Sequence, residues 1–177
     1  EDRSIFCIII DGQTALFMSI ASTPKQIGSL NFPQSVIGSF GPNNNTCYFI
    51  SKDAMLYQVS VNPKDGASIK KTFSFPSKRG EPTFISVIQN GIIIGTSIGK
   101  VCMYYGLEYS EYRSILRITN PVELVCQCEN NSYFIMDNQH NGMIHKVLED
   151  IPIKGYIKNV KQASPSTFLM KIAGNGK

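Results

Sequence analysis

The stretch NGIIIGTSIGKVCMYY, from Asn90 to Tyr105, holds two apolar runs on either side of a short polar segment. Ile, Val and Tyr dominate these runs, and β-branched and aromatic residues favour strands. Gly99 and Lys100 lie between the runs, and glycine accepts the positive φ that a tight hairpin turn requires. The stretch therefore predicts two antiparallel strands joined by a tight turn.

Four other stretches nearly repeat this arrangement of apolar run, polar turn and apolar run. They are SIFCIIIDGQTALFMSI (4–20), NTCYFISKDAMLYQVSV (45–61), NSYFIMDNQHNGMIHKV (131–147) and STFLMKIAGNGK (166–177), of which the last stops at its turn. The separations between successive turns are 41, 46, 43 and 34 residues when the turns are marked by Gly12, Asp53, Gly99, Gly142 and Gly176. A period of about 40 to 45 residues is typical of β-propellers with four strands in each blade.

Two further strands recur in phase with each hairpin. A short apolar run comes before it, as in SVIGSF from Ser35, TFISVI from Thr83, VELVCQC from Val122 and IKNVKQA from Ile157. A run that ends near Pro33, Pro76 or Pro121 marks the end of a unit. Proline suits an edge strand or a strand exit because it cannot donate to a ladder. Each unit therefore predicts strands a, b, c and d of one antiparallel sheet.

We predict an all-β fold: a single β-propeller region over residues 1–177, with four-stranded antiparallel blades. The predicted units are a partial blade at 1–33, blades at about 34–76, 82–120 and 122–156, and a partial blade at 157–177. Because a closed ring usually has more blades, we expect an incomplete or truncated ring. A β-sandwich is the alternative, since its strands also recur every 8 to 12 residues or so. GLEYSEYRSIL (106–116) fits a helix and a strand with a preceding loop equally well.

The strand b residues are expected to form the core, because both faces of a propeller blade are covered by neighbouring blades. These predicted core residues are Phe6, Ile8, Ile10, Tyr48, Ile50, Ile92, Ile94, Phe134 and Phe168.

Residues Ile93 to Val101, followed by Met103, Tyr104 and Tyr105, carry a resemblance to a known superfamily. An apolar-Gly-Thr/Ser-x-x-Gly-x-apolar stretch across strands b and c resembles the blades of divergent WD40-like β-propellers. Tyr104 and Tyr105 stand about where that superfamily often has a Trp-Asp pair, and this chain has no Trp. The resemblance implies a protein-interaction module similar to the propellers of coat, tethering, nuclear-pore and ciliary scaffolds.

Composition excludes some classes of function. Charged residues make up 17% of the chain and the net charge is +4, whereas soluble domains usually have about a quarter charged residues. The basic clusters Lys70–Lys71 and Lys78–Arg79 are too small to favour nucleic-acid binding. The longest apolar run, Ile5 to Ile10, is too short to span a bilayer. The first residue is Glu1 with no leader-like segment before it, so we expect an excerpt of a longer protein.

Several residue types could in principle carry chemistry. The five cysteines Cys7, Cys47, Cys102, Cys126 and Cys128 form no disulfide framework, and a zinc site from Cys126, Cys128, His140 and His145 would need four ligands in one place. Asp11, Asp53 and Asp137 recur near the b–c turns, where aspartate bonds its own backbone, so a turn role is favoured over a carboxylate set. No catalytic motif is present in the sequence, and we predict no enzyme activity, metal or cofactor.

Two functions remain. The first is a non-catalytic, cytoplasmic scaffold for protein partners, with the turns at Gly99, Lys100, Asn141 and Gly142 as contact sites on one rim. The second is an extracellular ectodomain of a receptor or channel-associated subunit. Glycosylation sequons at Asn44 and Asn130 favour the second function. The lack of a disulfide framework among the five cysteines favours the first.

Overall fold

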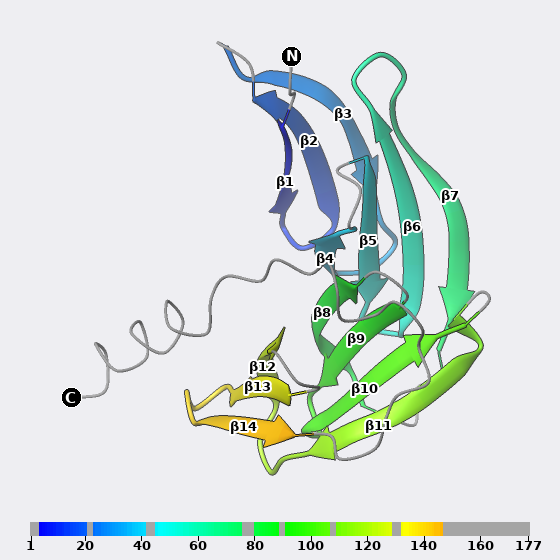
Figure 1. Cartoon of the computed structure of the whole chain (residues 1–177). Coiled ribbons are helices and arrows are strands. Elements are labelled where there is room, and N and C mark those ends of the chain that lie inside the picture. The colour runs from blue at the N-terminus through cyan, green and yellow to red at the C-terminus, as the bar shows by residue number, and fades with distance from the viewer. Residues whose placement is uncertain are drawn as a thin grey trace.

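The computed structural model describes residues 4–20, 23–41, 45–75, 80–88, 91–106, 109–128 and 132–146. Every regular element among these residues is a strand, and the strands form four antiparallel sheets that follow one another along the chain (Figure 1). Two of the sheets have four strands and two have three described strands. Within these residues none of the four sheets closes on itself.

The first sheet has the order β1 (Ser4–Ile10), β2 (Thr14–Ile20), β3 (Lys25–Asn31). The second has the order β4 (Val36–Phe40), β5 (Thr46–Ser51), β6 (Met55–Asn62), β7 (Gly66–Ser74). The third is β8 (Pro82–Ile88), β9 (Gly91–Thr96), β10 (Lys100–Tyr105), β11 (Glu111–Arg117). The fourth is β12 (Val122–Gln127), β13 (Ser132–Asp137), β14 (Gly142–Lys146).

These sheets confirm the predicted fold class, an all-β incomplete propeller. The quoted stretch forms β9 and β10, paired from Gly91–Tyr105 to Gly95–Val101. The second and third sheets contain strands a to d in the predicted order. Residues 111–117, for which a helix was the other prediction, form strand β11.

The strands a of the second, third and fourth sheets lie next to one another. Strand β4 contacts β8, and β8 contacts β12, so the strands a of three sheets form a row. Ser39 Oγ at the end of β4 is 3.3 Å from the backbone N of Val87, near the end of β8. Thr83 Oγ1 at the start of β8 donates to the carbonyl of Val122 at the start of β12, over 2.6 Å. The strands of this row therefore run in the same direction.

Alternation along each strand b sends side chains to two different neighbours. In β5, Tyr48 and Ile50 pack in a cluster with β9 of the next sheet, whereas Cys47 and Phe49 pack in a cluster with β2 of the preceding sheet. We call the side that points to the next sheet the forward face, and the side that points to the preceding sheet the rear face. Each core cluster joins one forward face to one rear face, which explains why the inner runs are apolar at nearly every position.

The predicted core is largely correct, and its failures follow from these faces. Five residues are at most 8% exposed: Tyr48, Ile50, Ile92, Ile94 and Phe134. The prediction was wrong for Ile8 and Ile10, which are 46% and 41% exposed, and Phe6 is only half-buried. These three lie on the rear face of the first sheet, and no sheet precedes it among the described residues. Phe168 lies outside the described residues.

Candidate protein-contact rim

The four turns between strands b and c share one backbone hydrogen bond. The amide of the third residue after strand b donates to the carbonyl of the last residue of that strand, at distances between 2.9 and 3.1 Å. The pairs are Gln13 to Ile10, Ala54 to Ser51, Gly99 to Thr96 and His140 to Asp137. The last strand b residues are therefore equivalent, and they are 41, 45 and 41 residues apart.

Three of these equivalent residues also brace the turn with their side chains. Ser51 Oγ lies 3.1 Å from the backbone N of Met55, and Thr96 Oγ1 lies 3.1 Å from the backbone N of Lys100. Asp137 Oδ1 accepts from the backbone N of Asn141 over 2.8 Å. All three residues are buried. A side-chain oxygen at this position thus satisfies a backbone amide at or just before the start of strand c and fixes the shape of the turn.

Asp137 is the most strongly held of the three. Its Oδ2 accepts from Asn120 Nδ2 over 2.8 Å and from Asn141 Nδ2 over 3.1 Å, and its Oδ1 also accepts from the amide of Gln139. The hydrogen bond from Asn120, with those from Asn141 and Gln139, lowers the pKa of Asp137 to about 2, against the opposing effect of burial. The carboxylate of Asp137 therefore braces the turn, which is the role that the sequence predicted for this residue.

The third residue after strand b has a left-handed backbone in three of the turns. The φ angles are 62° at Ala54, 74° at Gly99 and 63° at His140. At Gly99 a side chain is also excluded by space, because an added Cβ would lie 2.0 Å from the carbonyl oxygen of Ile118. The amide of Ile118 donates to the carbonyl of Gly99 over 2.8 Å, so the end of strand d is packed directly on this turn.

All four turns lie on one rim of the molecule. The residue after strand b bonds to the residue before strand a in the same sheet, as in Ser97 N to Glu81 O and Asn138 N to Pro121 O. The turn of the first sheet is tied to the next sheet, because the amide of Val36 donates to the carbonyl of Gly12 over 2.7 Å. Since the strands a run in the same direction, these contacts place every b–c turn on the same side.

The predicted contact residues differ in what they present on this rim. Gly99 is buried and Lys100 is half-buried, whereas Asn141 and Gly142 are exposed. In the turn of the third sheet the exposed side chain is Ile98, at 39%. The other turns and their flanks also present exposed polar side chains, among them Asp11, Gln13, Lys52, Asp53, Glu81, Asn138, Gln139 and His140.

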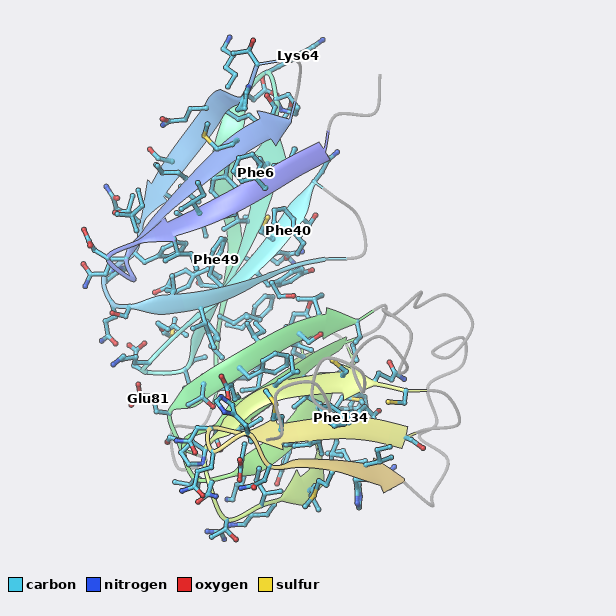
Figure 2. The ribbon with its side chains drawn as sticks, turned by 90° about the vertical axis from the view of Figure 1, so that its left-hand side faces the viewer. Phe6, Phe40, Phe49, Lys64, Glu81 and Phe134 are labelled. Carbon is cyan, nitrogen blue, oxygen red and sulfur yellow. The ribbon has the colours of Figure 1, made fainter. Side chains whose placement is uncertain are left out.

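One ion pair and one histidine–carboxylate contact link neighbouring parts of the rim. Lys52 Nζ in the second sheet lies 3.3 Å from Glu81 Oε1, which precedes the third sheet. His140 Nε2 lies 3.6 Å from Glu123 Oε2 within the fourth sheet. Both pairs are largely exposed, so each contributes little to the stability of the fold and mainly orients the side chains on the rim. Figure 2 shows Glu81 on this rim, whereas Lys64, in the turn between β6 and β7, lies far from it.

The other sequence candidates are dispersed over the sheets. No disulfide joins any of the five cysteines, all of which lie in the described part of the chain. Cys126 and Cys128 lie at strand a of the fourth sheet, whereas His140 is in its b–c turn and His145 is on β14. Among the described residues no three His, Cys, Asp or Glu side chains gather closely enough to hold a metal ion.

Some predicted features fall away from the rim or outside the described residues. The sequon residues Asn44 and Asn130 and the basic pair Lys78–Arg79 lie outside the described residues. Lys70 and Lys71 are exposed on β7, away from the rim turns. No helix within the described segments has the length and apolar character needed to cross a membrane.

Sequence reasoning found the turns but missed the residues that brace them. The missed residues are Ser51 and Thr96, whose hydroxyls take the place of the Asp137 carboxylate. A signal was present in the sequence, because a small polar residue stands directly before the turn in three successive units. The serine and threonine positions escape notice when only aspartate is considered, because a hydroxyl oxygen can accept a hydrogen bond from the same backbone amide as a carboxylate oxygen.

Comparison with solved structures defines the class of fold. The crystal structure of Sqt1 from Saccharomyces cerevisiae, a WD40 propeller protein, aligns with 76% of this chain at a TM-score of 0.55 and 13% sequence identity. The structure of apo AztD from Citrobacter koseri aligns with 84% of the chain at a TM-score of 0.47 and 10% identity. The chain spans 40% of the length of Sqt1 and 46% of that of AztD.

The chain thus has a divergent, propeller-like all-β fold, as its sequence pattern predicted. No protein-family model and no curated protein sequence matches it. The similarity to known structures therefore lies in the arrangement of strands.

Proposed function

We propose that this propeller is a non-catalytic scaffold for protein–protein interactions, as a module of a larger protein or of a multi-subunit complex such as those of trafficking or ciliary assemblies. One observation supports this most strongly, namely that the four b–c turns share one rim and one hydrogen-bonding scheme. A backbone fixed in this way can present different side chains at regular intervals without loss of its shape. Such a surface suits recognition of a protein partner.

The side chains on the rim fit this role. Ile98 supplies an exposed apolar contact, while Lys52, Glu81 and His140 supply charge or hydrogen bonds around it. An apolar centre with a polar surround is the usual anatomy of a protein interface. Both signs of charge occur together on the rim, which favours protein partners over nucleic acid. The contact residues proposed from the sequence, Lys100, Asn141 and Gly142, belong to the same surface.

A cytoplasmic location and the absence of a cofactor belong to this proposal. The lack of disulfides among the five cysteines supports a reducing compartment. An extracellular ectodomain is the second candidate, and the sequons at Asn44 and Asn130 favour it. Mass spectrometry of the protein from its native cell separates the two, because glycan on either asparagine would require the extracellular location.

The scaffold role is tested by photo-crosslinking in the native cell. A benzophenone amino acid replaces Ile98 on the rim or, as the control, Ile69 on β7, which is 42% exposed. We expect discrete crosslinked proteins from position 98 that are absent from position 69. Equal crosslinking from both positions, or none from position 98, would contradict the rim as the contact surface. The purified chain should turn over no substrate. An enzymatic activity that is lost on changing Asp137 or His140 would contradict the non-catalytic scaffold role.

A further inference from the structure

The b–c turn of the fourth sheet ends in an asparagine followed by a glycine, Asn141 and Gly142, and both residues are exposed. In such a pair the backbone nitrogen of the glycine can attack the side-chain amide carbon of the asparagine, because glycine has no Cβ to hinder the approach. The new N–Cγ bond closes a five-membered succinimide, and the Cγ–Nδ2 bond breaks. The amide nitrogen leaves as ammonia and takes the glycine N–H proton with it. Water then opens the succinimide to aspartate or isoaspartate.

The strand ladder leaves the attacking nitrogen accessible. The backbone N of Asp137 donates to the carbonyl of Asn141 over 3.1 Å, so these two residues form a hydrogen-bonded pair at the end of the β13–β14 ladder. Hydrogen-bonded and non-hydrogen-bonded pairs alternate along antiparallel strands, so the next pair, Met136 with Gly142, is of the second kind. The amide of Gly142 therefore points away from β13.

Another Asn-Gly pair in the chain provides a contrast. Asn90 itself lies outside the described residues, but Gly91, which supplies the attacking nitrogen there, is buried. An added Cβ on Gly91 would lie 2.4 Å from the carbonyl oxygen of Tyr104, so the backbone of β10 packs directly against this glycine. Removal of the amide proton by water or hydroxide is therefore easier at Gly142 than at Gly91.

Conversion of Asn141 to an acid would disturb the turn that it belongs to. Asn141 Nδ2 donates to Asp137 Oδ2 over 3.1 Å, and this hydrogen bond helps to lower the pKa of Asp137. A carboxylate at position 141 has no donor to offer, so two negative charges would face each other across the turn. Isoaspartate would also lengthen the main chain by one methylene just before β14.

We propose that Asn141 is a site of spontaneous deamidation, and that the acid formed there weakens the turn of the fourth sheet. The reaction needs only the chain and water, so it is independent of the proposed scaffold role. Asn141 and Gly142 lie on the rim, so the product adds a negative charge to the surface proposed for partner contact.

Peptide mapping by mass spectrometry tests the reaction in the unmodified chain. Residues 1–177 are incubated at pH 8 and 37 °C, and fragmentation of tryptic peptides locates each rise of one mass unit. We expect Asn141 to convert at least fivefold faster than Asn90. In concentrated urea the two rates should converge, because both glycines are then equally exposed. Equal rates in the folded chain, or a difference that persists in urea, would overturn the proposal.

Two variants test the attacking group and the effect of the product. Gly142→Ala should slow the conversion of Asn141 at least tenfold, and an unchanged rate would contradict attack by this nitrogen. Asn141→Asp should lower the equilibrium constant for folding at pH 7 at least tenfold more than Asn138→Asp, measured by urea denaturation. The control adds the same charge to an exposed side chain of the same turn. Equal losses in the two variants would overturn the role of the hydrogen bond to Asp137.

Discussion

Strands β1 and β9 have nearly the same apolar chemistry, yet one is exposed and the other is buried. Residues 7–10 of β1 are Cys-Ile-Ile-Ile, and residues 92–95 of β9 are Ile-Ile-Ile-Gly. Ile8 and Ile94 hold equivalent positions on the rear face, and they are 46% and 4% exposed. Strand β9 has a paired strand on each side and a sheet against each face, whereas β1 has one paired strand and a packed forward face. Burial in this fold is therefore a property of the neighbours of a strand as well as of its sequence.

The largest expected effect tests this difference directly. Ile94→Asp places a carboxylate inside the cluster between the second and third sheets, where it has no partner, and should lower the free energy of unfolding by at least about 4 kcal/mol. Ile8→Asp, at the equivalent position of β1, should cost less than about 1 kcal/mol. Urea denaturation of both variants measures the contrast. Similar losses in the two variants would mean that the rear face of the first sheet is covered in solution.

The contrast between β1 and β9 also shows how far the sequence predicts the fold. Apolar runs and turns recur with a regular period, so strands, sheets and their order were predictable from local chemistry. The exposure of Ile8 and Ile10 was not, because a run of isoleucines has the same pattern whether or not another sheet packs on it. The same limit applies to the rim, where the sequence located Gly99 as a turn residue. Only the packing of Ile118 on that turn shows that Gly99 itself is buried.

The second prediction concerns this glycine. Gly99→Ala keeps a φ of 74°, which is costly for a residue with a Cβ, and it also places that Cβ against the carbonyl oxygen of Ile118. We expect a loss of about 2 to 3 kcal/mol in the free energy of unfolding, from strain of this kind. Gly142→Ala, in an exposed part of the rim and not in a left-handed conformation, is the control and should cost far less. Thermal melting of the two variants distinguishes them, and equal melting temperatures would contradict the packing of strand d on this turn.

The third prediction compares the turn of the fourth sheet with those braced by hydroxyls. Hydrogen bonds lower the pKa of Asp137 from 3.8 to about 2, so the folded state favours its charged form. A lowered folded-state pKa gives stability that is complete above the unfolded pKa and is lost as the pH falls through the folded value. The stability of the native chain should thus decline between about pH 5 and pH 2 in part through this group.

Asp137→Asn removes that contribution. The variant should be less stable than the native chain at pH 6, because an amide nitrogen would face the donors of Asn120 and Asn141. The gap should narrow as the pH falls toward 2, and urea midpoints measured across this range check the trend. Asp11→Asn, in the exposed turn of the first sheet, is the matched loss of one carboxylate. A gap that stays constant with pH would show that the carboxylate is not the acceptor.

The smallest expected effect comes from His140, the residue equivalent to Gly99. His140 has a φ of 63° and is exposed, and the described contact of its side chain is the weak one with Glu123. His140→Gly should raise the free energy of unfolding by about 0.5 kcal/mol, because glycine adopts a left-handed backbone without strain. The His140–Glu123 pair is largely exposed, so its loss should offset only part of this gain. Urea denaturation of His140→Gly measures the net change, and Glu123→Gln measures the contribution of the pair separately. A loss of stability in His140→Gly larger than the loss in Glu123→Gln would mean that the histidine ring packs on the rim. The turns of the third and fourth sheets would then differ in side-chain packing as well as in their need for glycine.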